Sequence, residues 1–317
     1  MRLHSRLALG ALAAACASAS QPARVPATAS PGNGAATVRP AANPALADSV
    51  MAADAARSDS VARLGYLDGM MATLAPDVVY LRGGQPMAFG QLSVRAMLAS
   101  ALPAGAMSFR WQPVRVGVSN DGTVAYTMGI AASSSSAGTQ HATVRLDRYI
   151  AFWRRQEDGA WRVQAYAEIG PPPAKGPVLV NAGGPRPLHD FPSRDSLAHV
   201  LESTDSVFSA DALHQGLAHA FGTFAAPDAM TFAGSRFVVG PAAIRAEHMA
   251  PGEGSLSWRA VAGDAANSAD MGFTVGRYTF TVRGGVVGTG KYLTIWVEQP
   301  LGAWRYVADG GNADPSR

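Results

Sequence analysis

Hydrophobic and polar residues alternate in two long stretches of the chain, each interrupted by a glycine-containing turn. Such alternation predicts pairs of antiparallel strands with one face against a core. The stretches cover residues 148–169 and 290–312, and their aromatic and turn residues recur at one constant separation of 143 positions. The matching residues are Tyr149, Trp153, Gly159, Ala160 and Trp161 in the first stretch, and Tyr292, Trp296, Gly302, Ala303 and Trp304 in the second. The repeat predicts two copies of one domain.

The first copy is predicted to begin with helices. Apolar residues from Leu46 to Leu74 recur every three or four positions, with an interruption predicted at 58–60, and Pro76 with Asp77 is predicted to end the pattern. A short hairpin, a short helix and four longer strands are predicted to follow, over residues 78–81 with 87–89, 92–102, 108–118, 123–132, 141–155 and 161–169. These elements define a first domain at 45–170.

The second copy repeats these signals in the same order. Its helical pattern covers residues 197–224 and is predicted to stop at Pro227 and Asp228, as the first stops at Pro76 and Asp77. Further matches along the chain are Gly240 with Gly90, Arg245 with Arg95, Trp258 with Trp111, and Gly276 with Gly129. A segment rich in proline and glycine at 171–192 is predicted to be a semi-rigid linker. The second domain is therefore placed at 193–317.

The N-terminus is typical of an export signal. Arg2 and Arg6 precede an apolar run at 7–15, which is too short to span a bilayer. The residues LAAAC ending at Cys16 resemble the lipobox of bacterial lipoproteins, which implies cleavage before Cys16 and its acylation, with signal residues 1–16. The alternative is an ordinary cleaved signal, after Ala17 or Ala19. Residues 17–44 are mainly Ala, Pro, Ser, Gly and Thr, which predicts a disordered tether.

Composition and charge narrow the classes of partner. With 48% hydrophobic and 15% charged residues, the chain is typical of a globular protein. Removing the leader with Arg2 and Arg6 leaves 24 basic and 23 acidic residues and no basic run, which argues against a nucleic-acid partner. Cys16 is the only cysteine, so an intrachain disulfide is excluded.

The predicted order of helices, hairpin, helix and four strands resembles the nuclear transport factor 2-like (NTF2-like) superfamily. The closing pattern of Trp296, Gly302, Trp304 and Asp309 is similar to that of its SnoaL-like or DUF4440 group. The resemblance covers both copies, although Tyr166 stands in the first where Asp309 stands in the second. It implies an α+β fold in which each copy wraps a curved, mainly antiparallel sheet around its helices, forming a cone with an apolar pocket. It also implies that the copies pair through their sheets as an intramolecular pseudo-dimer.

Asp309 is the one candidate for catalysis. Alternation along the last strand predicts Trp304 and Tyr306 on one face and Arg305 and Asp309 on the other. An apolar cone would raise the pKa of the carboxyl and suit it to acid–base chemistry, as in ketosteroid isomerase, a distant fold relative. The alternative interpretation is a structural aspartate, paired with Lys291 or Arg305 or capping the glycine turn that follows.

Other residues are candidates for lining a pocket. In the first copy, Tyr166, Glu168 and Arg148 could bind a polar group of an otherwise apolar ligand. Aromatic residues that could line either cone, or equally belong to its core, are Tyr66, Tyr80, Trp111, Tyr126 and Trp258. Lys291 is the last candidate for lining a pocket.

Three hypotheses for function follow. The favoured one is an exported protein, anchored to the cell envelope through Cys16, that binds a small apolar or amphipathic molecule without turnover. The second is an isomerase- or cyclase-like enzyme that uses Asp309 as a base, and the third is a structural or interaction module. No metal site or cofactor is predicted, since His214 and His219 are five positions apart, which does not put them on one helical face, and no cluster of Asp, Glu or Cys accompanies them. Without an anchor, the protein is expected to be periplasmic or secreted.

Overall fold

The computed structural model describes residues 44–101, 107–135, 143–170, 193–233, 236–248, 254–282, 285–300 and 302–314. All of them belong to one compact unit, Thr37–Arg317. The predicted signal with Cys16, the linker at 171–192 and the tether up to residue 43 lie outside the described residues. Pro44, predicted to end the tether, is the first residue of a helix. No helix of the described ranges is long and apolar enough to cross a bilayer.

The first half contains four helices and a six-stranded sheet in its described residues. The sheet has the order β2-β1-β6-β5-β4-β3, and it is mixed because β1 runs parallel to β6 whereas the other neighbours are antiparallel. The elements are α1 (Pro44–Ala55), α2 (Arg57–Leu64), α3 (Tyr66–Thr73), β1 (Leu74–Leu81), β2 (Ala88–Phe89), α4 (Gly90–Ser100), β3 (Met107–Val118), β4 (Val124–Ser135), β5 (Thr143–Arg155) and β6 (Trp161–Glu168).

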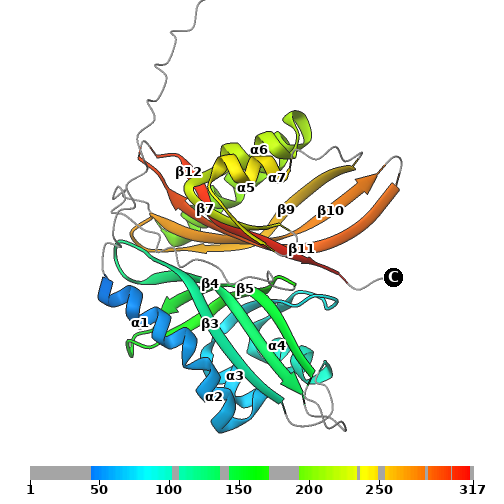
Figure 1. Ribbon diagram of the computed structural model, residues 1–317. Coiled ribbons are helices and arrows are strands. Elements are labelled where there is room, and N and C mark those ends of the chain that lie inside the picture. The colour runs from blue at the N-terminus through cyan, green and yellow to red at the C-terminus, as the bar shows by residue number, and fades with distance from the viewer. Residues whose placement is uncertain are drawn as a thin grey trace, which may run out of the picture. The chain divides into compact units, whose positions relative to one another are not determined.

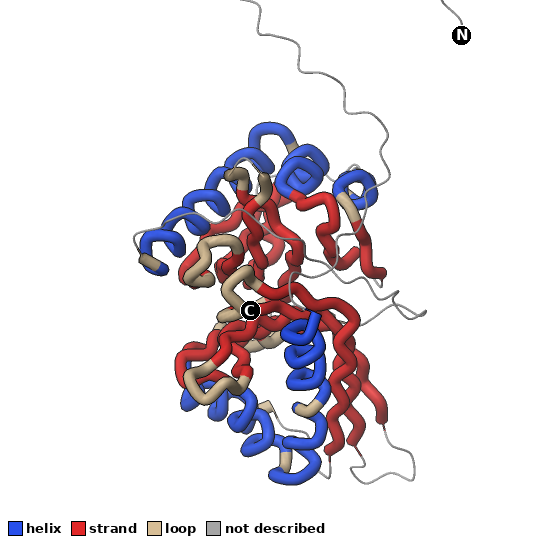
Figure 2. Tube along the Cα trace, turned by 90° about the vertical axis from the view of Figure 1, so that its left-hand side faces the viewer, coloured by secondary structure: helices blue, strands red, loops and turns tan. Residues whose placement is uncertain are grey.

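The second half has the same strand order, β8-β7-β12-β11-β10-β9, with β7 parallel to β12. Its elements are α5 (Arg194–Gln215), α6 (Leu217–Phe224), β7 (Ala225–Ala233), β8 (Arg236–Val239), α7 (Pro241–Glu247), β9 (Gly254–Ala265), β10 (Met271–Val282), β11 (Gly285–Glu298) and β12 (Trp304–Ala313). In both halves the helices lie on one face of the curved sheet (Figures 1 and 2). The predicted fold class, α+β with two tandem cones, is confirmed.

Glycines set the helix boundaries, which differ from those predicted. Gly65 and Gly216 have φ angles of 79° and 88°, a region that favours glycine, and each separates two successive helices. The predicted interruption at 58–60 instead lies within α2. Pro76 and Asp77 do not end a helix, because α3 ends at Thr73 and both residues belong to β1.

A β-bulge in β12 overturns the predicted faces of this strand. Ile295 pairs with Ala308 and Trp296 pairs with Tyr306, which leaves Val307 without a partner in β11. One extra residue reverses the alternation. Tyr306 therefore points into the cone, where its hydroxyl donates to the carbonyl of Phe221 at 2.6 Å, and Asp309 lines the cavity on that same side. The prediction that Tyr306 and Asp309 lie on opposite faces is wrong.

The sheet faces that the helices leave bare contact each other. The rings of Phe152 and Phe273 lie 4.8 Å apart, and Arg154 Nη2 donates to Asp264 Oδ2 at 2.8 Å. At the end of β12, the side-chain amide of Asn312 donates to the carbonyl oxygens of Leu81 and Glu168, which belong to the first half. Apolar packing and polar pairing both join the halves.

Candidate functional site

A buried aspartate lies at the centre of the first cone. Asp54, from α1, accepts hydrogen bonds at Oδ2 from the hydroxyls of Tyr149 (2.6 Å) and Thr127 (2.7 Å). The indole of Trp153 donates to Thr127 at 2.9 Å, which extends the network to the repeated closing strands. Burial raises the pKa of Asp54, although Arg57 and these hydrogen bonds act in the opposite direction. The network ties a helix to two strands of the sheet.

The second cone contains the same network. Asp205, from α5, accepts from the hydroxyl of Tyr292 at 2.5 Å, and Trp296 donates to Thr274 at 2.9 Å. The indole of Trp258 adds a hydrogen bond to Asp205 Oδ1 at 3.0 Å. Burial raises the pKa of Asp205 to about 6, despite the hydrogen bonds that it accepts.

The two networks differ in their charge. In the first cone, Arg57 has no exposed surface, pairs with Asp54 at 3.5 Å, and lies 4.6 Å above the rings of Trp111 and Tyr166. The corresponding position in the second cone, also three residues after the aspartate, is Phe208. Its ring lies 4.7 Å from that of Trp258. A cation compensates the buried carboxylate in the first cone, and an aromatic ring replaces that cation in the second.

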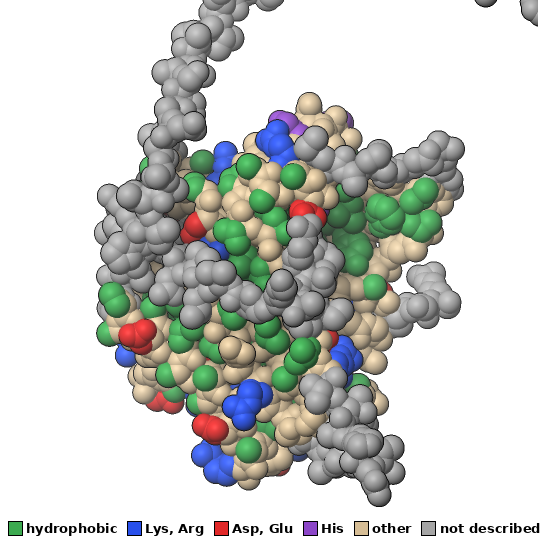
Figure 3. Space-filling view, viewed as in Figure 1, with side chains coloured by type: hydrophobic (Ala, Val, Ile, Leu, Met, Phe, Trp, Pro, Cys, Tyr) green, Lys and Arg blue, Asp and Glu red, His purple; other side chains and the backbone are tan. Residues whose placement is uncertain are grey.

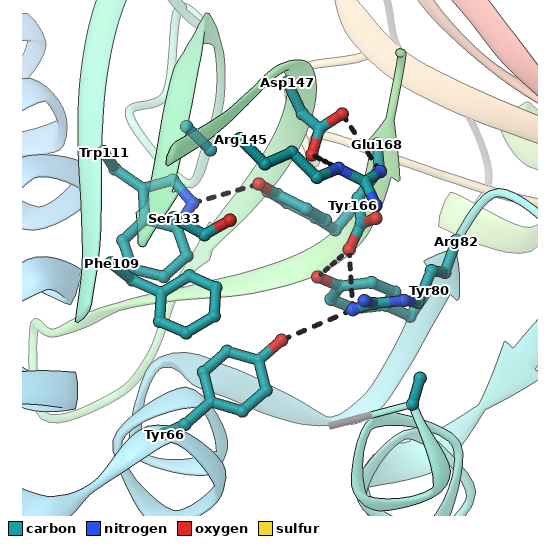
Figure 4. Close-up of a pocket in the computed structure, with 12 residues that line it drawn as sticks. Tyr66, Tyr80, Arg82, Phe109, Trp111, Ser133, Arg145, Asp147, Tyr166 and Glu168 are labelled. Carbon is teal, nitrogen blue, oxygen red and sulfur yellow. Dashed lines mark hydrogen bonds and ion pairs between the residues drawn. The ribbon is translucent and has the colours of Figure 1, made fainter. Parts of the chain in front are cut away.

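The cavity of the first cone is small and has paired polar groups (Figure 4). Its volume is about 90 Å³, and its lining includes Tyr66, Tyr80, Trp111, Tyr166 and Glu168. Glu168 Oε1 accepts from the hydroxyl of Tyr80 at 3.1 Å and from Arg82 at 3.3 Å. Burial raises the pKa of Glu168 while Arg82 lowers it. These polar groups already bind one another, which leaves little for a ligand.

The cavity of the second cone is larger and mostly aromatic. Its volume is about 230 Å³, and it is lined by Phe208, Phe221, Leu256, Trp258, Tyr278, Tyr292, Asp309, Gly310 and Gly311. Leu256 lies near the start of β9, and Tyr278 lies in the second half of β10, which pairs with β9 there. Hydrophobic side chains are exposed at this end of the sheet (Figure 3). Near the start of β11, which pairs with β10, Val286 and Val287 are 62% and 60% exposed.

Among the described residues, Asp309 is the only carboxyl group in the lining of this cavity. Its Oδ1 accepts a hydrogen bond from the hydroxyl of Thr294 at 2.5 Å. Burial raises its pKa to about 7, and the nearby charge of Asp205 contributes in the same direction. Among the described residues, neither Lys291 nor Arg305 forms an ion pair with Asp309, which was one form of the structural interpretation. The other form, capping of a glycine turn, is also wrong, because Gly310 and Gly311 belong to β12.

Three of the predicted pocket residues lie on the opposite faces of the sheets. Tyr126 accepts a hydrogen bond from Arg115 at 3.0 Å on the face toward the second half. The guanidinium of Arg148 lies 4.8 Å above the ring of Phe232. Lys291 is fully buried and pairs with Asp314 at 3.3 Å. Their neighbours in the strands, such as Tyr149 and Tyr292, face the cones instead, because successive side chains of a strand point to opposite faces.

Asp54, Arg57 and Asp205 are site residues that the sequence patterns did not predict. A signal was present, because each aspartate is followed four residues later by a serine, Ser58 or Ser209. Asp205 and Ser209 lie on α5, whereas Asp54 is near the end of α1 and Ser58 is near the start of α2. Each serine accepts a hydrogen bond from the backbone of the matching tryptophan, Trp111 at 3.0 Å and Trp258 at 2.9 Å. A polar pair at the same place in both copies, within an apolar helical pattern, indicates a shared buried network.

No metal centre emerges from the described part of the chain, which has no cluster of three His, Cys, Asp or Glu side chains that could hold an ion. The lining of the second cavity therefore offers aromatic faces, one carboxyl group and hydroxyls. Chemically, it can bind an apolar body, exchange a hydrogen bond with a polar group, and gain or lose a proton at Asp309.

Comparison with known proteins gives matches among solved structures. No protein-family model matches the sequence, and none of the curated proteins matches it. A ketosteroid isomerase-like protein from Erwinia carotovora atroseptica is 20% identical over 38% of this chain and 95% of its own, with a TM-score of 0.31. An NTF2-like protein of unknown function from Pseudomonas putida is 17% identical over 46% of this chain and 99% of its own, with a TM-score of 0.34. ActVI-ORFA from Streptomyces coelicolor is 14% identical over 39% of this chain and 96% of its own, with a TM-score of 0.32.

Proposed function

We propose that the protein binds a small amphipathic molecule in the cavity of the second cone. The observation that supports this most directly is the lining, a volume of about 230 Å³ among aromatic side chains, in which Asp309 is the one carboxyl group that the described residues contribute. Ligand pockets combine a predominantly apolar wall with few polar groups that orient the ligand. The apolar body of the ligand would pack on Trp258 and Phe221, and its polar group would reach Asp309.

A neutral aromatic alcohol provides the direct test. Isothermal titration calorimetry with 3-phenyl-1-propanol is expected to show one binding event, which Leu256→Trp abolishes because the larger side chain fills the cavity. Leu92→Trp is the matched control, since Leu92 is 85% exposed on α4 and the same substitution there leaves the cavity open. Equal heats for both variants, or none for the wild type, would contradict the proposal.

An acid–base enzyme is the second candidate, and the pKa of Asp309 favours it. A general base works best when its pKa is close to the working pH, and burial raises that of Asp309 to about 7. Binding without turnover is preferred because Tyr166 stands in the first cone where Asp309 stands in the second, so the candidate base is not repeated in both copies. Under the enzyme hypothesis, Asp309→Asn would abolish turnover and retain ligand binding.

We also propose that the chain is exported and anchored to the cell envelope through an acylated Cys16, with its halves acting as an intramolecular pseudo-dimer. The motif before Cys16 supports the anchor, and the contacts of Phe152 and Arg154 with the second half support the pairing. Fractionation of cells expressing the intact chain tests the anchor, since recovery entirely in the soluble fraction would exclude it.

A further inference from the structure

The first cone shows how this fold accommodates a cation. The guanidinium of Arg57 lies over the faces of Trp111 and Tyr166, both at 4.6 Å, and forms an ion pair with Asp54. Aromatic faces attract cations through their quadrupoles, and a carboxylate adds charge compensation. The cone thus provides aromatic walls and an acid, and the chain itself supplies the positive charge.

The second cone keeps the walls and the acid without the cation. Trp258 and Asp205 correspond to Trp111 and Asp54, and Phe208 replaces Arg57. Asp309 stands where Tyr166 stands in the first cone, and Gly311 stands where Glu168 stands. In the described residues, no Lys, Arg or His lies within ion-pair distance of Asp205 or Asp309. Among the described residues, each cone therefore has two carboxyl groups, Asp54 and Glu168 in the first and Asp205 and Asp309 in the second. Only those of the first cone are paired with arginine side chains, Arg57 and Arg82.

We propose that the cavity of the second cone selects a protonated amine with an apolar body, whose ammonium group binds Asp309 between the rings of Trp258, Tyr278 and Tyr292. This inference rests on the proposed function and specifies the class of its ligand. The ammonium group supplies the charge that Arg57 supplies in the first cone. The apolar body occupies the wall formed by Phe208, Phe221 and Leu256.

Other ionisable groups near this position reinforce the preference for a cation. Asp205 on α5 is close enough to Asp309 to raise its pKa, and Tyr292 lies on β11, the strand paired with that of Asp309. Tyr278 comes from β10, and the charge of Glu202 raises the pKa of Asp205. His248, after α7, stacks on Phe221 at 4.1 Å, and burial lowers its pKa, so the neutral form is favoured. None of these groups therefore carries a positive charge at neutral pH.

A matched pair of ligands tests the inference. At pH 8, 3-phenylpropylamine is expected to bind at least about tenfold more tightly than 3-phenyl-1-propanol, which has the same body and no charge. At pH 5.5 the amine remains protonated whereas Asp309 is mostly neutral, so the advantage is expected to fall by about tenfold or more. Affinity for the alcohol is expected to stay constant between these pH values.

Two variants locate the preference. Asp309→Asn is expected to bind amine and alcohol equally, whereas Glu168→Gln, in the cavity of the first cone, is expected to keep the difference.

If the alcohol binds and the amine gains nothing at pH 8, the inference fails and the proposed function stands. If neither compound binds, both fail. If only Glu168→Gln loses the preference for the amine, the amine binds in the first cone and the inference is overturned. A preference of the wild type that does not change with pH would also overturn the inference.

Discussion

Replacing Arg57 with methionine is expected to lower the free energy of unfolding by about 3–5 kcal/mol at pH 8. Arg57 and Asp54 have no exposed surface, so the variant leaves a carboxylate without its cation inside the first cone. It also removes the guanidinium from the faces of Trp111 and Tyr166. Urea denaturation followed by tryptophan fluorescence measures the loss.

The pH dependence identifies the mechanism of this loss. Without Arg57, the pKa of Asp54 in the folded state rises further above its unfolded value, so the variant is expected to lose stability as pH rises from about 4 toward that raised pKa. The double variant Asp54→Asn with Arg57→Met buries no charge and is expected to be more stable at pH 8 than the single variant.

Arg95→Met is the matched control, because the Arg95–Asp68 pair is 44% and 63% exposed and is expected to contribute less than about 1 kcal/mol. An equal effect of Arg57→Met and Arg95→Met would refute the interpretation of a compensated buried charge.

Asp309→Asn is expected to stabilise the ligand-free protein at pH 8 by about 1–3 kcal/mol. Burial raises the pKa of Asp309 from its ordinary 3.8 to about 7, so the folded state binds a proton more tightly than the unfolded state. The contribution of Asp309 to stability is therefore full below about pH 4, falls as pH rises to about 7, and is constant above that value. Asparagine has no charge to bury and can still accept from Thr294.

Thermal unfolding between pH 4 and pH 9 measures this effect. The difference between wild type and variant is expected to be small near pH 4 and to grow up to about pH 7. Asp68→Asn is the control for loss of a negative charge at an exposed position. A variant that is less stable than the wild type at pH 8 would show that the Asp309 carboxylate is well compensated in the cone. Stabilising substitutions in a binding site commonly reduce function. Asp309→Asn is accordingly expected to raise stability and to remove a group that binds the ligand.

Much of the architecture could be predicted from local patterns. Strand alternation and the recurring Trp-Gly-Trp positions located the closing strands of both halves, because they depend only on the period of the strand and on turn residues. Prediction failed where a feature depends on strand pairing. The bulge at Val307 has no local signal, yet it places Tyr306 and Asp309 on the same side and decides what lines the cavity.

The faces of the central strands illustrate the same limit. Tyr126 and Arg148 have aromatic and charged side chains suited to a pocket, but both point to the contact between the halves. In a sheet covered on both faces, hydrophobicity no longer distinguishes the cone from that contact. Residue type therefore identified candidates, and only the coordinates assigned each of them to a face.

The amino-acid sequence by itself determined the two copies, the order of their elements and the tryptophans that close each cone. The tertiary structure alone decided the charge of each cavity, because compensation of a buried group depends on side chains distant in the sequence. Tyr292 and Asp205, 87 positions apart, are hydrogen-bonded, and Phe208 stands where Arg57 stands in the first cone. Electrostatic energy in a buried site depends on distance through space, and the order of residues along the chain does not specify that distance.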